Sequence, residues 1–459
     1  PGPGMQESGA MEAQEKMRAQ GLDEIAVATF ATHLQDLHAG EQGTLAEGDI
    51  EPMESVPALE DLSPGEEAEA ALDATVVIKL NGGLGTSMGM SGPKSLLEAK
   101  DGRSFLDLSV AQVQALRERT GARLPLVLMN SFATREASLT ALEGHGDVSG
   151  DLPADFVQGR VPKLHADTLE PVDWPPDPAL EWAPPGHGDL FPSLVTSGLL
   201  DTLLDRGYEH AFVSNVDNLG AVLEPRILAW MAAERIPFVM EVARRTEADR
   251  KGGHLARRPD GGLVLRELAQ TPEEDLEAFQ DVERHRFFNT NTLWLDLGAL
   301  RALLDERDGV LTLPMIVNRK TVDPADKGSP EVLQLETAMG AAIDVFDGAR
   351  AVCVPRTRLA PVKTTNDLLV LRSDAYVLED DGRVTPTRSQ GDPVVDLDSD
   401  HFKLLDDFEA RFPAGPPSLA ACDRLTVDGD VTFGHGVVVR GSVHVEGPRR
   451  IEDGALLEG

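Results

Sequence analysis

The chain has 459 residues, of which 41% are hydrophobic and 26% are charged, as in an ordinary soluble protein of two or three domains. Its formal net charge of −36 argues against nucleic acid or an anionic membrane as a partner, and no apolar run has the length of a membrane span. Two cysteines are too few for a disulfide framework or a cysteine-built metal site, so we expect a cytoplasmic protein.

The first 70 residues are predicted to form a helical segment that packs on the main domain. Apolar residues recur at helical spacing between Leu22 and Leu37. Residues 47–69 are acidic and contain three prolines, a composition typical of a connector.

A strand followed by a glycine-rich loop is the most distinctive feature of the chain. Residues 75–80 are rich in β-branched side chains, which predicts a strand buried on both faces. Five glycines follow between residues 82 and 92, and Lys94 comes directly afterwards. Glycines let main-chain N–H groups approach an anion, most often a phosphate, and a lysine adds a compact charge. The stretch therefore predicts a nucleotide-phosphate site.

Two better-known glycine motifs do not fit this loop. Pro93 stands between Gly92 and Lys94, where the Walker motif needs an N–H group. Gly85 and Gly89 lie one residue too far apart for the dinucleotide-binding motif, which argues against a dehydrogenase.

Strands and helices alternate through the middle of the chain. Helical patterns at residues 105–119 and 134–142 are interleaved with strand patterns, which fall at 125–129, 211–215, 238–243 and 292–295. This alternation predicts an α/β fold with a mixed, mostly parallel sheet and ligands at the carboxyl ends of its strands.

Two loops carry polar groups that suit a nucleotide or a sugar phosphate. The Gln158 amide can pair with both a carbonyl and an N–H of a pyrimidine edge, although it could simply cap a turn. His187 lies on a rigid loop between Gly186 and Gly188 and suits a sugar or phosphate, with a structural role as the alternative. We expect Asp189 to cap the helix that follows.

Three further segments add candidate ligands. Asp217 follows a predicted strand and is placed for Mg²⁺, with an Asx-turn as the alternative. Asn289 and Asn291 are two residues apart, which would put them on one face of an extended segment beside sugar hydroxyls. Lys363 lies on a turn before a helix and could equally be a surface lysine, whereas residues 335–343 suggest a core helix without chemistry.

The pattern changes after the proline-rich joint at 412–417. Apolar residues recur every six positions, at Leu425, Val431, Val437 and Val443. This is the period of a parallel β-helix, for which a structural or assembly role is expected.

The stretch Lys-Leu-Asn-Gly-Gly-Leu-Gly-Thr-Ser-Met-Gly at 79–89, followed by Gly-Pro-Lys-Ser, resembles the nucleotide-binding loop of eukaryotic-type UTP–glucose-1-phosphate uridylyltransferases, also called UDP-glucose pyrophosphorylases. Seven further motifs are similar to the family's and follow its order. They include Phe-Val-Gln-Gly-Arg-Val-Pro, Ser-Asn-Val-Asp-Asn-Leu-Gly and Phe-Phe-Asn-Thr-Asn-Thr-Leu-Trp. Where the family commonly has Cys-Lys before Gly-Pro-Lys, this chain has Met90-Ser91.

The resemblance implies a Rossmann-like nucleotidyltransferase fold related to the GT-A type, with a left-handed C-terminal β-helix. It divides the chain into a helical segment (1–70), a catalytic domain (71–385) and a linker with the short β-helix (386–459). It implies catalytic roles for Lys94 and Lys363 and a metal role for Asp217. The nucleotide would be bound by Leu80, Asn81, Gly82, Gly83, Gln158, Gly186, Asn215 and Asp217, and the sugar phosphate by His187, Asn289, Thr290 and Asn291.

The implied reaction is reversible, Mg²⁺-assisted transfer of UMP from UTP to glucose 1-phosphate, which gives UDP-glucose and pyrophosphate. Neither nucleic acid nor a membrane is expected as a partner, and the resemblance leaves room for a homo-oligomer. One alternative is a broader UDP-sugar pyrophosphorylase that accepts other sugar phosphates. Another is a catalytically silent binder of nucleotide sugars.

Overall fold

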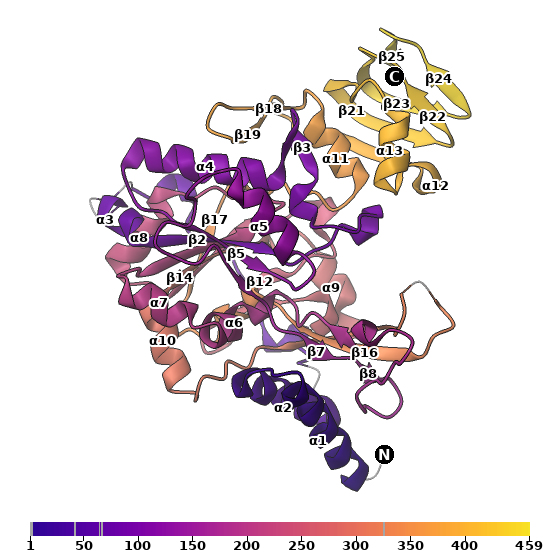
Figure 1. Cartoon of the computed structure of the whole chain (residues 1–459). Helices are drawn as coiled ribbons and strands as arrows, with labels where there is room; N and C mark the ends of the chain where they lie inside the picture. Colours follow the sequence, from indigo (N-terminus) through magenta and orange to yellow (C-terminus); the bar gives the residue numbers. More distant parts are fainter. Residues whose placement is uncertain (1–2, 41–42, 64, 66–67, 325) are drawn as a thin grey trace.

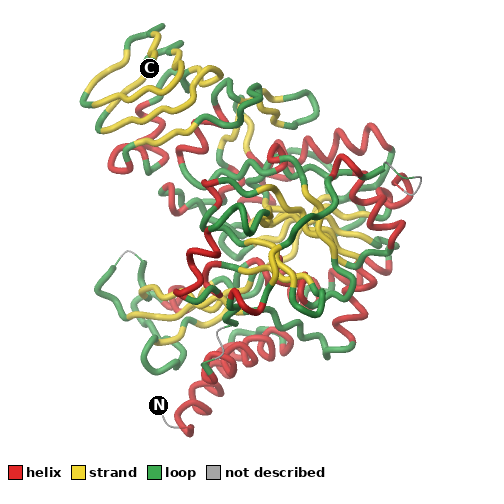
Figure 2. The backbone as a smooth tube through the Cα atoms, turned by 180° about the vertical axis from the view of Figure 1, so that it is seen from behind, coloured by secondary structure: helices red, strands yellow, loops and turns green. Residues whose placement is uncertain are grey.

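The computed structural model describes residues 3–40, 43–63, 65, 68–324 and 326–459. A ten-stranded mixed sheet forms its centre, and helices cover this sheet on both faces (Figure 1). The N-terminal helices and the C-terminal strands lie at opposite ends of the molecule (Figures 1 and 2). Of the helices in these ranges, none is both long enough and apolar enough to cross a membrane.

The central sheet is parallel on one side and antiparallel on the other. Strands β10, β2, β5 and β6 run parallel to one another, whereas β14 runs antiparallel to both β10 and β11. The ten strands are β1 (Glu51–Pro52), β2 (Thr75–Asn81), β5 (Leu126–Asn130), β6 (Asp155–Val157), β10 (His210–Asn215), β11 (Phe238–Arg244), β12 (His254–Arg257), β13 (Leu263–Arg266), β14 (Phe287–Asp296) and β17 (Arg350–Cys353).

Helix ends follow local sequence signals. Helix α4 begins at a capping box in which Ser104 and Asp107 bond each other's main chain, and it ends at Gly121 with φ +72°. The α-helices are α1 (Pro3–Ala19), α2 (Glu24–Ala39), α3 (Ala68–Asp73), α4 (Phe105–Thr120), α5 (Arg135–Glu143), α6 (Leu190–Thr196), α7 (Leu199–Asp205), α8 (Pro225–Glu234), α9 (Leu276–Gln280), α10 (Leu297–Asp305), α11 (Thr365–Arg372), α12 (Ser399–Phe402) and α13 (Leu405–Arg411).

One predicted helix is wrong. Residues 335–337 end strand β16 (Glu331–Thr337), and a short 3₁₀ helix, η10 (Met339–Asp344), follows. Strand β16 pairs with β15 (Met315–Thr321) over its whole length and with β8 (Leu164–His165) on its other side. These neighbours satisfy its main chain and bury Leu335 in this second sheet, whereas the apolar residues of η10 pack in the main core.

Small sheets complete the fold. Three two-stranded pairs are β3 (Glu98–Lys100) with β4 (Arg103–Ser104), β7 (Val161–Pro162) with β9 (Trp182–Ala183), and β18 (Tyr376–Leu378) with β19 (Val384–Pro386). At the C-terminal end, parallel strands lie side by side. Leu425 pairs with Val443, which lies three six-residue repeats further along the chain. These strands are β20 (Val394–Leu397), β21 (Ser418–Asp428), β22 (Val431–Phe433), β23 (Val438–Glu446), β24 (Arg449–Ile451) and β25 (Leu456–Glu458).

Candidate active site

The glycine-rich loop and the Asp217 turn leave the sheet at the same edge. Asn215 on β10 pairs with Leu80 on β2, so the loops after these two strands start side by side. The glycine loop folds back on itself, because the Lys94 amide donates to the Gly83 carbonyl oxygen at 3.1 Å. Lys94 Nζ then lies 2.5 Å from Asp217 Oδ2, and both side chains are mostly buried.

Asn81 differs from its neighbours because its side chain faces the protein interior. Its amide donates to Asn130 Oδ1 at 2.7 Å and to Ser138 Oγ at 2.8 Å. The side chain therefore ties β2 to β5 and the helix beside them, while the exposed Gly83 lies at the surface of the loop. Asn215 is half-buried, next to this loop.

Gly82 and Gln158 are in contact. A β-carbon on Gly82 would lie 2.8 Å from Gln158 Oε1, so only glycine leaves room for this amide. The Gln158 loop is held by Asp189, whose Oδ2 accepts from the Gly159 amide and from Ser193 Oγ, each at 2.6 Å. The predicted helix cap by Asp189 is thus wrong, because its oxygen accepts from the Gly159 loop and from the Ser193 side chain within α6 and makes no capping bond to the helix main chain. Burial raises its pKa to about 6, although these two bonds oppose the shift.

His187 is a neutral hydrogen-bond donor. Its Nδ1 accepts from the Met339 amide at 3.0 Å, which places the ring proton on Nε2. Burial lowers its pKa to about 4, so the ring carries no charge at neutral pH. The preceding Gly186 has φ +80° and packs against the main chain of Thr337, where a β-carbon would lie 2.4 Å from the carbonyl oxygen.

The asparagine pair lies on a β-bulge rather than on a regular extended face. The register of β14 shifts here, and Asn291 adopts φ +57°. Asn289 Nδ2 donates to Asn291 Oδ1 at 3.0 Å, so the two amides meet directly. Thr290 Oγ1 donates inward to the Glu241 carbonyl oxygen at 2.8 Å and fixes the bulge.

Lys363 is exposed beside the Asp217 turn. The main chains of Asn218 and Pro361 form a β-bridge, and Ala360 donates its amide to Asn218 Oδ1 at 2.9 Å. The Lys363 amide is held by Asp367 at 2.8 Å. This packing brings the segment that carries Lys363 next to Asp217 and Lys94.

Glu267 is a further polar group that motif analysis missed. Its carboxylate packs against Gly253, where a β-carbon would lie 2.5 Å from Oε1, and the Gly253 carbonyl oxygen accepts from the Asn289 amide at 3.1 Å. Burial raises the pKa of Glu267 to about 7, while the charge of Lys363 lowers it. One feature of the sequence could have indicated Glu267. It is an acidic residue directly after a strand, at the edge of the sheet where the other ligand-binding loops lie.

A buried charge network lies beneath the Asp217 turn. Lys79 Nζ donates to Ser214 Oγ at 2.8 Å and to the Ala221 carbonyl oxygen at 3.1 Å. Burial, and then the charge of Arg358, lower the pKa of Lys79 to about 7. Lys79 therefore stabilises the Asp217 turn from its buried side.

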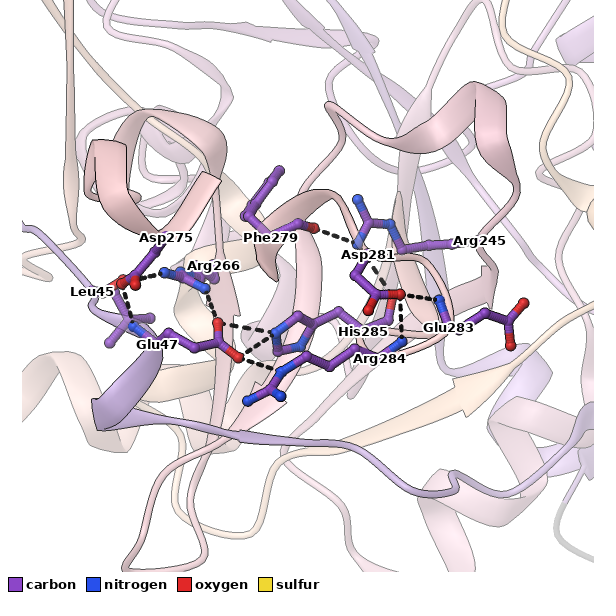
Figure 3. Close-up of polar contacts among 10 residues, drawn as sticks. All are labelled: Leu45, Glu47, Arg245, Arg266, Asp275, Phe279, Asp281, Glu283, Arg284 and His285. Carbon is purple, nitrogen blue, oxygen red and sulfur yellow. Dashed lines mark hydrogen bonds and ion pairs between the residues drawn. The ribbon is translucent and has the colours of Figure 1, made fainter. Parts of the chain in front are cut away.

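A second polar cluster lies at the end of β13, which directly precedes Glu267, and before β14, which carries Asn289 (Figure 3). Arg266 is fully buried and donates to Glu47 and Asp275, and Glu47 also pairs with His285 at 3.0 Å. Because Glu47 lies in the N-terminal segment, the cluster fastens that segment to β13 and to the residues before β14.

Asp217 is the carboxylate beside the glycine loop that could bind a metal ion. Within the described ranges, no three His, Cys, Asp or Glu side chains converge as a complete metal site. Asp217 does present a carboxylate beside the glycine loop, and Mg²⁺ commonly binds to one or two carboxylates with phosphate oxygens filling the remaining positions. The donor set therefore fits a Mg²⁺ ion that arrives with a phosphate ligand.

Comparisons with known proteins agree with this geometry. A family profile described as UTP–glucose-1-phosphate uridylyltransferase matches residues 28–440. The UTP–glucose-1-phosphate uridylyltransferase of Solanum tuberosum is 43% identical over 399 residues, which covers 85% of this chain and 81% of the relative. The enzyme of Saccharomyces cerevisiae is 42% identical over 411 residues, covering 88% and 81%.

Solved structures are similar over the whole fold. The UDP-glucose pyrophosphorylase of Leishmania major superposes with a TM-score of 0.92 at 46% identity, covering 98% of both chains. A mutant of that enzyme in complex with UDP-glucose gives the same values. The Trypanosoma brucei enzyme has a TM-score of 0.89 at 44% identity, covering 98% of this chain and 100% of its own. This chain therefore belongs to the UTP–glucose-1-phosphate uridylyltransferase family, the nucleotidyltransferases that form UDP-glucose from UTP and glucose 1-phosphate.

Proposed function

We propose that the reaction proceeds by in-line attack of the glucose 1-phosphate oxygen on the α-phosphorus of UTP. The bond between the α- and β-phosphates breaks, and pyrophosphate leaves with the electron pair. The sugar phosphate is already an anionic nucleophile, so the step needs no general base. Catalysis then consists of alignment and charge neutralisation.

Lys94 and Lys363 are the proposed catalytic residues. They come from two segments that both contact the Asp217 turn, where the phosphates of both substrates would meet. The Lys94 ammonium group forms an ion pair with the Asp217 carboxylate. A triphosphate bound at the loop would compete with this carboxylate for the ammonium group. Lys363 is exposed and free to reach the phosphates.

The nucleotide is proposed to bind along the glycine loop. Gln158 would face the uracil edge, with Gly82 and Gly186 shaping the pocket and Leu80, Asn81 and Gly83 contributing main chain. Asn215 would contact the nucleotide beside them. The contact between Gly82 and Gln158 supports this arrangement, because it joins the phosphate loop to the base-reading amide.

The sugar phosphate is proposed to bind between His187 and the bulge. His187 offers its Nε2 proton, while Asn289 and Asn291 offer amides and Thr290 holds the bulge. Glu267 adds an acceptor for sugar hydroxyls from the opposite side. Both His187 and Asn289 contact the start of η10, which brings the two sides of this subsite together.

Mg²⁺ is the proposed cofactor and Asp217 its protein ligand. Bound there, the ion would neutralise charge on the triphosphate. UDP-glucose-bound relatives support the product, and UTP, glucose 1-phosphate and pyrophosphate complete the proposed partners.

The remaining proposals concern the architecture. We place boundaries at residues 70 and 385, assign the catalytic domain to a GT-A-like nucleotidyltransferase fold, and interpret the stacked C-terminal strands as a short left-handed β-helix, which their parallel register supports. A homo-oligomer also belongs to the proposal.

A cytoplasmic location is proposed as well. Cys353 and Cys422 are both free thiols, which suits a reducing compartment.

The observation that carries the proposal is the convergence of Lys94, Asp217 and the Lys363 segment at one edge of the sheet. The test is pyrophosphate release with Mg²⁺ and UTP, with glucose 1-phosphate compared against galactose 1-phosphate and N-acetylglucosamine 1-phosphate. We expect release with glucose 1-phosphate and little with the other two. Comparable release with all three would indicate a broader UDP-sugar pyrophosphorylase, and no release from protein that binds UTP would indicate a silent binder.

A further inference from the structure

A separate cavity of about 410 Å³ lies at the edge of the central sheet. Its walls come from residues 53–57, the β12–β13 hairpin and the end of η10 with the residues that follow. Two other cavities measure about 10 and 30 Å³, too small for anything beyond water. The edge cavity, as we call it, is therefore large enough for a small molecule.

The edge cavity combines apolar walls with cationic side chains. Val56, Leu263 and Phe346 contribute apolar surface. Arg257 and Arg350 also line it, and neither makes an ion pair with any residue that the structure describes. Both side chains are exposed to solvent, so their guanidinium groups are accessible to an anion that enters the cavity.

The carboxylates of the cavity do not cancel this positive charge. Asp344 is already bound at both oxygens by Arg258, at 2.9 and 2.7 Å. Asp347 is the other carboxylate in the lining, against two arginines. The cavity therefore favours an anion with an apolar body, since a guanidinium binds carboxylate, phosphate or sulfonate oxygens in pairs.

The short helix η10 connects this cavity with the proposed sugar-phosphate subsite. At its start, Met339 donates to His187, and Gly340 packs so closely on Asn289 that a β-carbon would lie 2.8 Å from Nδ2. At its end, Ile343 and Asp344 line the edge cavity. The helix is buried and only six residues long, so it is a direct packed connection between the two places.

We propose that the edge cavity is an effector site for a small anion with an apolar body, held by Arg257 and Arg350 and coupled through η10 to sugar-phosphate binding. The site itself stands on the cavity and its arginines. Its coupling rests on the proposed function of His187 and Asn289.

The site is tested with 8-anilinonaphthalene-1-sulfonate, whose fluorescence rises on binding, and with N-phenyl-1-naphthylamine, which has the same rings without the sulfonate. We expect saturable binding of the sulfonate and much weaker binding of the amine. Combining Arg257→Ala with Arg350→Ala should weaken sulfonate binding roughly tenfold or more, because two charge-assisted contacts are lost. Ser55→Trp, which fills the mouth of the cavity, should weaken both probes.

The matched control is Arg119→Ala, which removes an exposed arginine on α4 and should leave probe binding unchanged. Equal binding of the two probes, or unchanged binding in the double variant with its circular dichroism preserved, would overturn the site. None of these variants touches the proposed catalytic residues, so pyrophosphate release without probe tests the proposed function separately.

Coupling is tested with two pairs of measurements. The dissociation constant of the sulfonate is measured with and without saturating UDP-glucose, and the dissociation constant of UDP-glucose is measured with and without saturating sulfonate. Thermodynamic linkage requires both constants to change by the same factor, which we expect to be roughly fivefold. Unchanged constants in both directions would overturn the coupling. If UDP-glucose completely displaces the sulfonate both from the wild type and from the arginine double variant, the probe binds in the active site. That result would overturn the proposed effector site.

Discussion

Arg358 and Glu241 form a two-point ion pair, with Arg358 Nη2 2.6 Å from Glu241 Oε1 and Arg358 Nε 2.7 Å from Oε2. Glu241 is almost fully buried and also accepts from Trp294 Nε1 at 3.0 Å. The Arg358 carbonyl oxygen in turn accepts from Asn218 Nδ2 at 3.2 Å. The pair therefore fixes the segment that leads to Lys363 against the turn that carries Asp217.

Removing one charge of this pair should affect both stability and catalysis. Glu241→Gln removes the carboxylate that is directly bonded to buried Arg358 and leaves only the nearby charge of Glu224, which we expect to lower the unfolding free energy by about 3 kcal/mol. Because Lys363 and Asp217 would no longer be held together, kcat should fall about tenfold while the KM for UTP changes little. Urea unfolding and steady-state kinetics measure the two effects. Wild-type kcat in folded Glu241→Gln would refute the positioning role.

Asp217→Asn should make the enzyme more dependent on Mg²⁺. The amide keeps the shape of the side chain but lowers its affinity for a hard cation. We expect the Mg²⁺ concentration for half-maximal activity to rise about tenfold or more, and kcat to fall, when a single carboxylate ligand is replaced. Titration of activity with MgCl₂ measures the change. An unaltered Mg²⁺ profile would remove Asp217 as the metal ligand.

Ser91→Lys should strengthen UTP binding. Ser91 is exposed next to the glycine loop, three residues before Lys94. An added charge near the triphosphate should lower the KM for UTP about threefold at low salt, a surface effect that KCl screens. Kinetics at two salt concentrations check this, with Ser91→Gln as the uncharged control. An equal gain in both variants would contradict the electrostatic explanation.

His254→Phe should reduce acid sensitivity. The His254 ring is buried against His285, with centroids 3.8 Å apart, and neither of its nitrogens has a partner among the described residues. Burial, and then the charges of His285 and nearby arginines, lower its pKa well below the ordinary value. The unfolded chain therefore takes up a proton below pH 6.5 that the folded protein cannot accept.

Linkage then gives the sign and size of the effect. Stability contributed by neutral His254 is complete above its unfolded pKa and is lost as pH falls, by about 1.4 kcal/mol per pH unit. Phenylalanine has no proton to gain, so the variant should lose less stability than the wild type between pH 7 and 5.5. Thermal unfolding across this range measures the difference. Parallel pH curves for the two proteins would show that another group dominates.

The sequence was sufficient for the features that depend on local pattern. The buried strand before the glycine loop, helix α4 and helix α2 fall where periodicity predicts them, within a few residues at each end. Helix α1 lies within the segment predicted to be helical, but its bounds were not predicted, because few of its residues are apolar and its packing on α2 depends on tertiary contacts. The core helix expected at 335–343 was wrong for a similar reason, since strand pairing with β15 takes up residues 335–337 and leaves only a short 3₁₀ helix after them.

The sequence predicted which segments contribute to the candidate site, but it did not predict how their side chains are arranged. Motifs located Lys94, Asp217, His187 and Asn289 in the chain, whereas the Lys94–Asp217 ion pair and the bulge at Asn291 depend on folding. Glu267 lies outside the motifs considered, and only the fold brings it toward Lys363.

The central claim is that Lys94 and Lys363 are the catalytic charges, and kcat for UDP-glucose formation in Lys94→Ala and Lys363→Ala tests it most directly. The matched control is Lys320→Ala, which removes an exposed lysine on β15. We predict that each of the first two variants loses roughly a hundredfold or more in kcat, the cost of one preorganised charge contact, while the control keeps wild-type turnover. Near-wild-type kcat in both Lys94→Ala and Lys363→Ala would contradict the mechanism.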